Sequence, residues 1–286
     1  MIPKLLLSAA TALALLAMAT PAQAASLPVV NMEAVVTASF VEGSRGNQPT
    51  LGDDASTMLV QSALTAKGFK VKLDGRYSRA TTAAYAKYQR SLGYKGIDAN
   101  GIPGQQSLTA LGKGRFTVAN VVRIGSRHSH YGSKRVNTRT RHMLAAADRT
   151  LPWKIKVTQG SYCVLEKSGC ATASAGTHDG GGSIDIKATS LSKAKRWRTV
   201  QALRRVGFAA WLRVPSQCGG CWHTHIHAVA IGDTDMWQKN KKYTNRDQVG
   251  DYFVGRNGLA SHKRDNTPVR YRVPFITWEQ YLRQSA

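Results

Sequence analysis

Two short segments rich in metal-binding residue types constrain the fold of this 286-residue chain more than any other feature. The first runs from His178 through three glycines to Asp185, and the second is His223-Thr-His225-Ile-His227. Residues i and i+2 of a β-strand point to the same face, so His225 and His227 would share one side of a sheet. The glycines allow the backbone to turn tightly between His178 and Asp185. We therefore expect strands and a loop to surround one polar site.

The surrounding hydropathy pattern predicts an α+β domain over residues 114–286. Alternating apolar residues predict half-buried strands in three segments, residues 153–157, 183–186 and 224–231. Helical spacing predicts one helix over residues 140–148 and a basic amphipathic helix within 192–212. The sheet is expected to be small and mostly antiparallel. Residues 233–286 either complete the core or form a strand-rich cap over the cleft, and we favour the first interpretation.

The preceding part of the chain has a different texture. Helical spacing and stop signals predict three short helices, near residues 56–66, 78–92 and 104–111. These form a small helical module over residues 51–113. Residues 25–50 show no sustained helical or strand period, and we interpret them as a linker.

Residues 1–24 have the three parts of a secretory signal peptide. Lys4 gives a positive start, Leu5 to Ala19 is apolar, and Ala22-Gln-Ala24 is a cleavage site with small residues. No later apolar run approaches the roughly 20 residues that span a bilayer. We expect a secreted protein, extracellular or periplasmic, without stable membrane insertion.

The chain is strongly basic, with 40 lysines and arginines against 16 acidic residues and a formal net charge of +24. Such a charge attracts polyanions. Export argues against nucleic acid, so anionic cell-wall polymers are the expected charged partners. The basic residues of the predicted helix are interpreted as a solvated face, namely Lys193, Lys195, Arg196, Arg198, Arg204 and Arg205. The sequence leaves the oligomeric state open.

Export also places the four cysteines where disulfides persist. Cys163, Cys170, Cys218 and Cys221 allow three pairings. We favour Cys163 with Cys170 and Cys218 with Cys221, which would brace loops on either side of the histidine segments. Crossed pairings stay open at this stage.

The histidine and aspartate pattern suits a metal-assisted hydrolase. Zinc takes imidazole nitrogen and carboxylate oxygen, and a catalytic site keeps three protein ligands and one open position for water. His178, Asp185 and one of the paired histidines supply that set. The other histidine of the pair would move a proton from water to a leaving amine. The pattern therefore predicts amide hydrolysis with Zn²⁺ as cofactor.

Two resemblances make this prediction more specific. In residues 51–113, Val60-Gln61, Asp74-Gly75-Arg76-Tyr77 and Tyr88-Gln89 are similar to the peptidoglycan-binding helical module often fused to wall hydrolases. The resemblance implies that this module binds peptidoglycan.

The second resemblance is to the zinc D-alanyl-D-alanine peptidases, which are grouped with the lysostaphin-type endopeptidases. It rests on His178 followed by Asp185, then His225-Ile-His227, and it covers about residues 118–232. It implies zinc ligands His178, Asp185 and His227, with His225 as the catalytic base. The family also has an arginine, upstream of the first ligand, that steadies the substrate. The corresponding stretch here is Val157 to Tyr162, with Gln159 where the arginine is expected. Whether Gln159 replaces that arginine stays open, and we take Gln159 as a candidate catalytic residue.

The sequence therefore predicts a secreted zinc peptidoglycan peptidase acting on the stem peptide or cross-bridge. Carboxypeptidase and endopeptidase action both remain open. The alternative is a non-catalytic wall-binding protein with a structural or degenerate metal site, which the missing arginine motivates.

Overall fold

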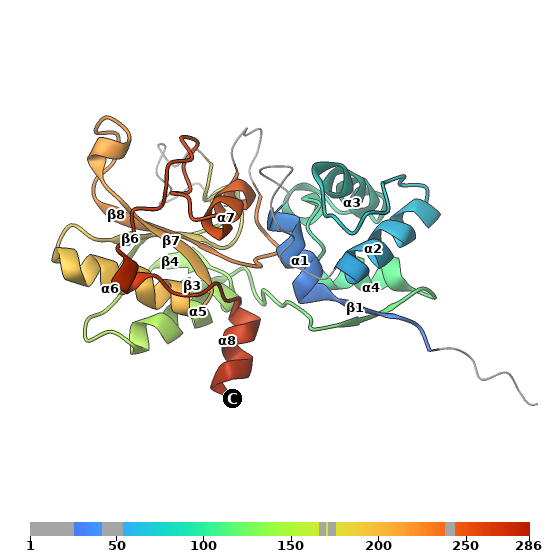
Figure 1. Cartoon of the computed structure of the whole chain (residues 1–286), viewed down its shortest axis with the longest axis horizontal. Coiled ribbons are helices and arrows are strands. Elements are labelled where there is room, and N and C mark those ends of the chain that lie inside the picture. The colour runs from blue at the N-terminus through green and yellow to red at the C-terminus, as the bar shows by residue number, and fades with distance from the viewer. Residues whose placement is uncertain (1–25, 42–53, 166–169, 171–175, 238–243) are drawn as a thin grey trace, which may run out of the picture.

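The computed structural model describes residues 26–41, 54–165, 170, 176–237 and 244–286. These residues form a helical region, residues 29–119, and a sheet region, residues 129–286, which lie side by side (Figure 1). The expected signal peptide, residues 1–24, lies outside the described residues. No helix in the described ranges is both long and apolar enough to span a membrane.

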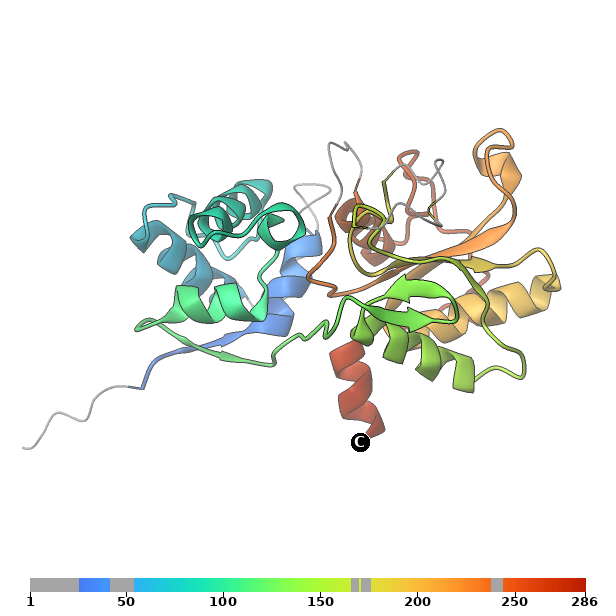
Figure 2. The ribbon, with the colours of Figure 1, turned by 180° about the vertical axis from the view of Figure 1, so that it is seen from behind.

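The helical region is a set of short helices beside a two-stranded sheet (Figure 2). Its elements are β1 (Val29–Asn31), α1 (Met32–Val41), α2 (Asp54–Ala66), α3 (Arg79–Ser91), the 3₁₀ helix η1 (Gly96–Ala99), α4 (Gln105–Gly112) and β2 (Thr117–Ala119). The three expected helices are present as α2, α3 and α4. Strands β1 and β2 pair in parallel. The helical region therefore extends past both ends of the expected module.

The prediction that residues 25–50 form a linker is wrong for residues 29–41. Residues 29–41 of the segment 25–50 form β1 and α1, and Val30, Met32 and Phe40 are fully buried. Eight of the ten residues of α1 are buried, so the helix is covered on most of its circumference. A helix buried all round has no polar face and therefore no amphipathic period in its sequence. Residues 42–50 lie outside the described part of the chain.

The sheet region is built on four antiparallel strands in the order β5-β6-β8-β7. The strands are β5 (Val157–Gln159), β6 (Ser183–Lys187), β7 (Phe208–Arg213) and β8 (His225–Ala230). The hairpin β3 (Ser129–Tyr131) and β4 (Lys134–Val136) precedes α5 (Thr138–Arg149), and α6 (Lys193–Arg205) connects β6 to β7. The expected antiparallel sheet is confirmed.

The two faces of this sheet pack against different parts of the molecule (Figure 1). Ile184, Ile226 and Ala210 share a core with α5 and α6. Trp211 and Val229 belong to the other core, which includes α7 (Asn245–Phe253) and the helical region. Because side chains alternate along a strand, the odd-numbered residues of β6, β7 and β8 face α7.

Two element boundaries differ from the sequence prediction. The strand expected at residues 153–157 begins only at Val157. The helix expected within 192–212 ends at Arg205, and β7 starts at Phe208 after Gly207, whose φ is +94°. Every residue of β7 is buried, so its apolar run could not be distinguished from a buried helix by periodicity alone. Arg204, expected on the solvated helix face, is 3% exposed.

The C-terminal segment completes the core, as we favoured, and does so with helices. Besides α7 it contains the 3₁₀ helix η4 (Val269–Tyr271) and α8 (Trp278–Ser285). Val249, Tyr252 and Trp278 are buried in the two cores.

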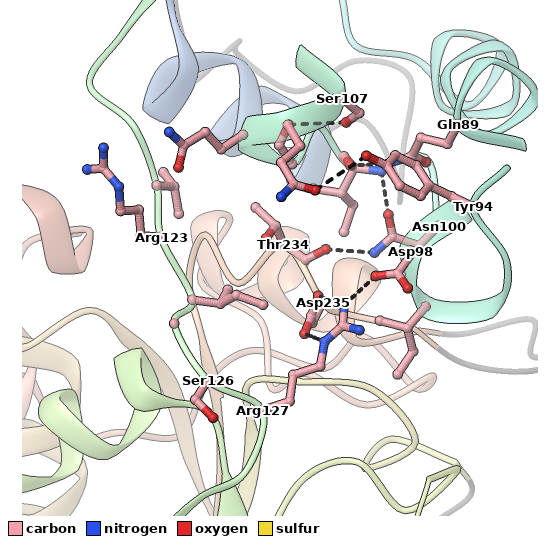
Figure 3. A pocket seen from close by; sticks show the side chains of 18 of the residues that line it. Gln89, Tyr94, Asp98, Asn100, Ser107, Arg123, Ser126, Arg127, Thr234 and Asp235 are labelled. Atoms are coloured by element: carbon pink, nitrogen blue, oxygen red, sulfur yellow. Dashed lines mark hydrogen bonds and ion pairs between the residues drawn. The ribbon is translucent and has the colours of Figure 1, made fainter. Parts of the chain in front are cut away.

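The helical and sheet regions are docked against each other. Helix α1 packs on α7, and one hydrophobic core runs through both regions. Asn100 donates to the carbonyls of Thr234 (2.7 Å) and Met236 (3.0 Å), and Arg127 contacts both Asp98 and Asp235 (Figure 3). The helical region is therefore held in a fixed orientation on the sheet region.

Candidate metal centre

His178, Asp185 and His227 come together as the sequence predicts. One ligand atom from each lies within 4.8 Å of the other two. Both histidines are buried and Asp185 is partly exposed. One buried His-Asp-His group that could bind a metal ion is therefore present in the described structure.

The sheet register positions the strand half of this group. Asp185 on β6 lies directly opposite His227 on β8, and His227 lies opposite Trp211 on β7. A register shift in β5 between Val157 and Gln159 places Gln159 opposite Asp185. A bulge of this kind re-aims a side chain relative to the plain alternation. The four residues Gln159, Asp185, His227 and Trp211 thus form one row across the sheet.

The other half of the metal group, His178, lies on a loop with glycines at positions where a side chain would not fit. A Cβ on Gly180 would lie 2.3 Å from the backbone nitrogen of Trp237, and one on Gly182 would lie 2.8 Å from the Cβ of Asp233. Gly182 also has a φ of +81°. The Gly181 amide donates to the carbonyl of Asp235 at 2.8 Å. The loop that carries His178 is therefore wedged tightly against residues 233–237.

Each imidazole is anchored by the nitrogen that does not face Asp185. His178 Nδ1 lies 2.7 Å from the carbonyl oxygen of Gly160, and His227 Nε2 lies 3.1 Å from Oε1 of Gln248. An oxygen acceptor requires the N–H on that nitrogen, which leaves the lone pair on the other nitrogen. The outer acceptors therefore favour the neutral tautomer in which His178 Nε2 and His227 Nδ1 are the ligand nitrogens. Without a metal, these two nitrogens lie within ion-pair or hydrogen-bond distance of Asp185. Outer hydrogen bonds of this type fix the tautomer of metal ligands.

The donor set fits a tetrahedral metal, and of its two spacings the one to His178 matches a tetrahedral shell, whereas the one to His227 is a hydrogen-bond distance. His178 Nε2 is 3.4 Å from Asp185 Oδ2, and His227 Nδ1 is 2.8 Å from Asp185 Oδ1. In a tetrahedral shell with bonds of about 2.1 Å, donor atoms lie about 3.4 Å apart. Two imidazoles and one carboxylate supply three ligands and leave a further position open.

The protonation equilibria also suit a metal. Burial alone would raise the pKa of Asp185, but His178 and His227 hold that pKa well below its usual value. Burial lowers the pKa of His227 despite the nearby carboxylate. For His178, burial lowers the pKa, but Asp185 and the Gly160 carbonyl outweigh it and the net shift is upward. An ionised Asp185 and a neutral His227 are the forms that bind metals, whereas a metal would displace the proton held by His178.

His225 lies beside the group and is more open to solvent. Its side chain is 20% exposed, and its Nε2 is 3.8 Å from Asp185 Oδ1. Its Nδ1 lies 2.7 Å from the carbonyl oxygen of His223, which places the N–H on Nδ1 and the lone pair on Nε2. Trp222 packs edge-on against the ring. The Nε2 atom of His225 therefore points toward Asp185 and is able to accept a proton.

Gln159 lies opposite Asp185 in the sheet register, but its side-chain amide is directed at Cys163. It is 6% exposed, and its Nε2 lies 4.0 Å from Sγ of Cys163. Within the described residues its side chain makes no hydrogen bond to His178, Asp185 or His227. Its catalytic role stays a prediction.

Sequence reasoning missed Gln248 and Trp211. Gln248 on α7 anchors His227, and Trp211 stacks on the His227 ring with centroids 6.4 Å apart and planes inclined by 15°. The only signal near Gln248 is the capping box of Thr244 and Asp247, which marks the start of a helix but not the face that meets the sheet.

The favoured disulfide pairing is confirmed. Cys163 is bonded to Cys170, and Cys218 is bonded to Cys221. The Cys163 amide donates to the carbonyl of His178 at 2.9 Å, so the first disulfide adjoins the metal-site loop. The second lies shortly before β8. Two disulfides are compatible with an extracellular protein.

Comparison of the chain with protein-family models, with curated proteins and with solved structures gives no match.

Proposed function

We propose that this protein is a secreted zinc-dependent peptidoglycan peptidase that hydrolyses an amide bond in the stem peptide or cross-bridge. The observation that carries the proposal is the outward anchoring of both imidazoles, which turns one nitrogen of each ring and the Asp185 carboxylate toward a common point. The position of His225 beside that point supports catalysis over a purely structural site. The resemblance of the histidine segments to zinc D-alanyl-D-alanine peptidases supports the substrate class.

The three residues that would hold the zinc are His178, Asp185 and His227. Zinc, when bound, supplies a Lewis acid that lowers the pKa of water and polarises a carbonyl group. The hydrogen bonds to Gly160 and Gln248 keep the two imidazoles in the orientation that binding needs.

His225 would transfer the proton. Its Nε2 lone pair can accept a proton from the attacking water, and the hydrogen bond from Nδ1 to His223 steadies the imidazolium that results. The same nitrogen can then donate the proton to the departing amine. The partial exposure of the ring gives a substrate access to it.

Gln159 or a nearby backbone amide would stabilise the oxyanion. In the structure its side-chain amide lies against Cys163, so this role requires another rotamer of Gln159. One more hydrogen-bond donor aimed at an oxyanion is typically worth about 10² to 10³ in rate.

The helical region would bind peptidoglycan. Because it is docked and not flexibly tethered, it would hold the wall in one orientation relative to the metal centre. Docking of this kind favours particular bonds in the polymer as well as raising local substrate concentration.

The test is product release from intact sacculi by the purified protein, with chelator and then with zinc add-back. Release of D-Ala that depends on zinc would identify a carboxypeptidase, and release of fragments cut at the cross-bridge would identify an endopeptidase. If no product were released from several wall types, the proposal that this protein is an enzyme would be wrong.

The second candidate is a non-catalytic wall-binding protein with a structural or degenerate metal site. The orientation of the Gln159 amide toward Cys163 favours it, since Gln159 in this orientation does not take the place of the family arginine. It predicts that the protein binds sacculi and zinc but releases nothing.

A further inference from the structure

A cavity of about 520 Å³ lies on the sheet region, and none of the metal ligands lines it. Its walls come from the end of α6, the end of α7 and the segments around residues 262–265 and 272–275. Its lining includes four arginines and a histidine, namely Arg204, Arg256, Arg264, Arg272 and His262. Asp265 is its acidic lining residue. The cavity therefore carries an excess of positive charge.

The acidic groups nearby neutralise only part of this charge. Asp265 pairs with Arg204 at 2.9 Å, and Arg204 also donates to the carbonyl of Ala210. Asp251, behind the wall, accepts from His262 at 2.8 Å and lies 3.7 Å from Nη1 of Arg256. Arg204 and its aspartate thus form a balanced pair that belongs to the structure.

Two arginines are left facing the cavity without a carboxylate. Arg272 uses Nε to donate to the carbonyl of Thr267 at 3.0 Å, which leaves its two terminal nitrogens available. Among the described residues no carboxylate lies within ion-pair distance of Arg264 or Arg272. The Nη1 of Arg256 is buried and lacks a hydrogen-bond partner in the described structure. Arg264 and Arg272 therefore retain donors for a ligand, and Arg256 adds positive charge to the lining.

The arrangement of the cationic groups favours a phosphate ligand over a carboxylate ligand. A carboxylate presents two oxygens in a plane and is satisfied by one guanidinium in a bidentate pair. Here the cationic groups come from two neighbouring segments, joined by the β-bridge between Arg256 and Arg264, and from Arg272 of a third segment. A tetrahedral phosphate presents oxygens in several directions and can meet all of them at once.

The cavity is separated from the metal centre by one aromatic layer. Trp211 stacks on His227 and donates from Nε1 to the carbonyl of Arg256 at 2.9 Å. Tyr252, which lines the cavity, packs edge-on against Trp211. A ligand in the cavity would therefore lie beyond Trp211 and would not contact the metal ligands.

We propose that this cavity binds a phosphate group, held by Arg264 and Arg272 and by the positive charge of Arg256. In an exported protein the phosphate would belong to a wall phosphodiester polymer or to a lipid headgroup. The site is independent of the proposed hydrolysis, because within the described part of the chain none of its residues forms a hydrogen bond or ion pair with His178, Asp185, His225 or His227.

The test compares two double variants of equal charge. Arg264→Gln with Arg272→Gln removes two of the three cavity arginines, whereas Arg198→Gln with Arg205→Gln removes two exposed arginines of α6. The probes are inorganic phosphate, a glycerol-phosphate oligomer and vesicles of phosphatidylglycerol, each titrated calorimetrically or by sedimentation at fixed ionic strength. Thermal unfolding and metal content confirm that both variants are folded.

We expect the cavity variant to weaken phosphate binding by at least tenfold, because each charge-assisted hydrogen bond is worth about a factor of ten. The α6 variant should stay within about twofold of the unchanged protein. Tighter binding of the oligomer than of free phosphate would identify a polymer as the source, and tighter binding of vesicles would identify a lipid. Equal losses in both variants, or no phosphate binding at millimolar concentration, would overturn the site.

Discussion

The two imidazoles of the candidate metal centre are held by different means. His227 is fixed by the sheet, where it pairs with Asp185 in register and is stacked on Trp211. His178 is on a loop whose position depends on packing against residues 162–164 and 233–237. Backbone ladders resist local opening more than loops do. The strand half should therefore be rigid, while the loop half depends on distant contacts.

Those distant contacts lead to the helical region. Asp235 accepts the Gly181 amide at its backbone carbonyl, and its carboxylate accepts hydrogen bonds from Tyr162 and Arg127. Arg127 in turn contacts Asp98 of the helical region (Figure 3). A continuous chain of contacts thus joins the docked region to the loop that carries His178.

The largest effect is expected at Asp185, which contacts both halves. Asp185→Asn keeps the shape but removes the charge that faces His178 and His227. Loss of a direct ligand should exceed the 10- to 100-fold losses in metal affinity that are typical of outer residues. Zinc titration with a competing chelator measures the change. A variant that binds zinc as tightly as the unchanged protein would contradict the ligand assignment.

A smaller effect is expected when the strand half loses its anchor. Gln248→Leu removes the acceptor of His227 Nε2 and should lower metal affinity by about 10- to 100-fold. Gln201→Leu, on an exposed part of α6, is the matched control and should leave the affinity unchanged. Equal affinities in the two variants would show that the sheet alone orients His227.

The loop half can be loosened from a distance. Arg127→Gln breaks the bridge between Asp98 and Asp235 and should cost about 1 to 3 kcal/mol of local stability. Hydrogen exchange should quicken in residues 176–182 and stay unchanged in β8, which serves as an internal control. Equal changes in both segments would mean that the two halves are not held separately.

The smallest effect is expected in the pH dependence of folding stability, and it concerns Asp233, which packs against Gly182. Burial raises the pKa of Asp233 to about 6, and the neighbouring charge of Asp235 adds to the shift. A carboxyl with a raised pKa in the folded state stabilises the fold at low pH, and this contribution is lost as pH rises from about 4 through 6. Asp233→Asn, which cannot ionise, should therefore gain stability relative to the unchanged protein over that interval.

Chemical denaturation of the two proteins at pH 4, 5, 6 and 7 measures this difference. A constant difference in unfolding free energy across the series would show that Asp233 keeps an ordinary pKa.

The sequence was most informative where local patterns decide the structure. The period-two pattern placed His225 and His227 on one face of β8, and the glycines signalled the tight turn after His178. The favoured disulfide pairing, one of the three that the sequence left open, is the observed one. These features could be predicted because they depend only on residues that are close together in the sequence.

Features that depend on tertiary packing could not be found in this way. Helix α1 is buried on most sides and so lacks a periodic signal, and Gln248 becomes an anchor only because α7 packs over β8. The excess of lysine and arginine was visible, yet the burial of Arg204 and the cavity around it arise from segments far apart in the sequence. The side-chain direction of Gln159 depends on a bulge that no sequence pattern marked.

The most direct test of the central claim is zinc content and product release for His227→Ala beside His130→Ala. His130 is exposed on the β3–β4 hairpin and takes no part in the metal group. The account predicts about one zinc per chain and zinc-dependent cleavage of sacculi for the control, with both lost in His227→Ala. Wild-type metal content and cleavage in His227→Ala would contradict it.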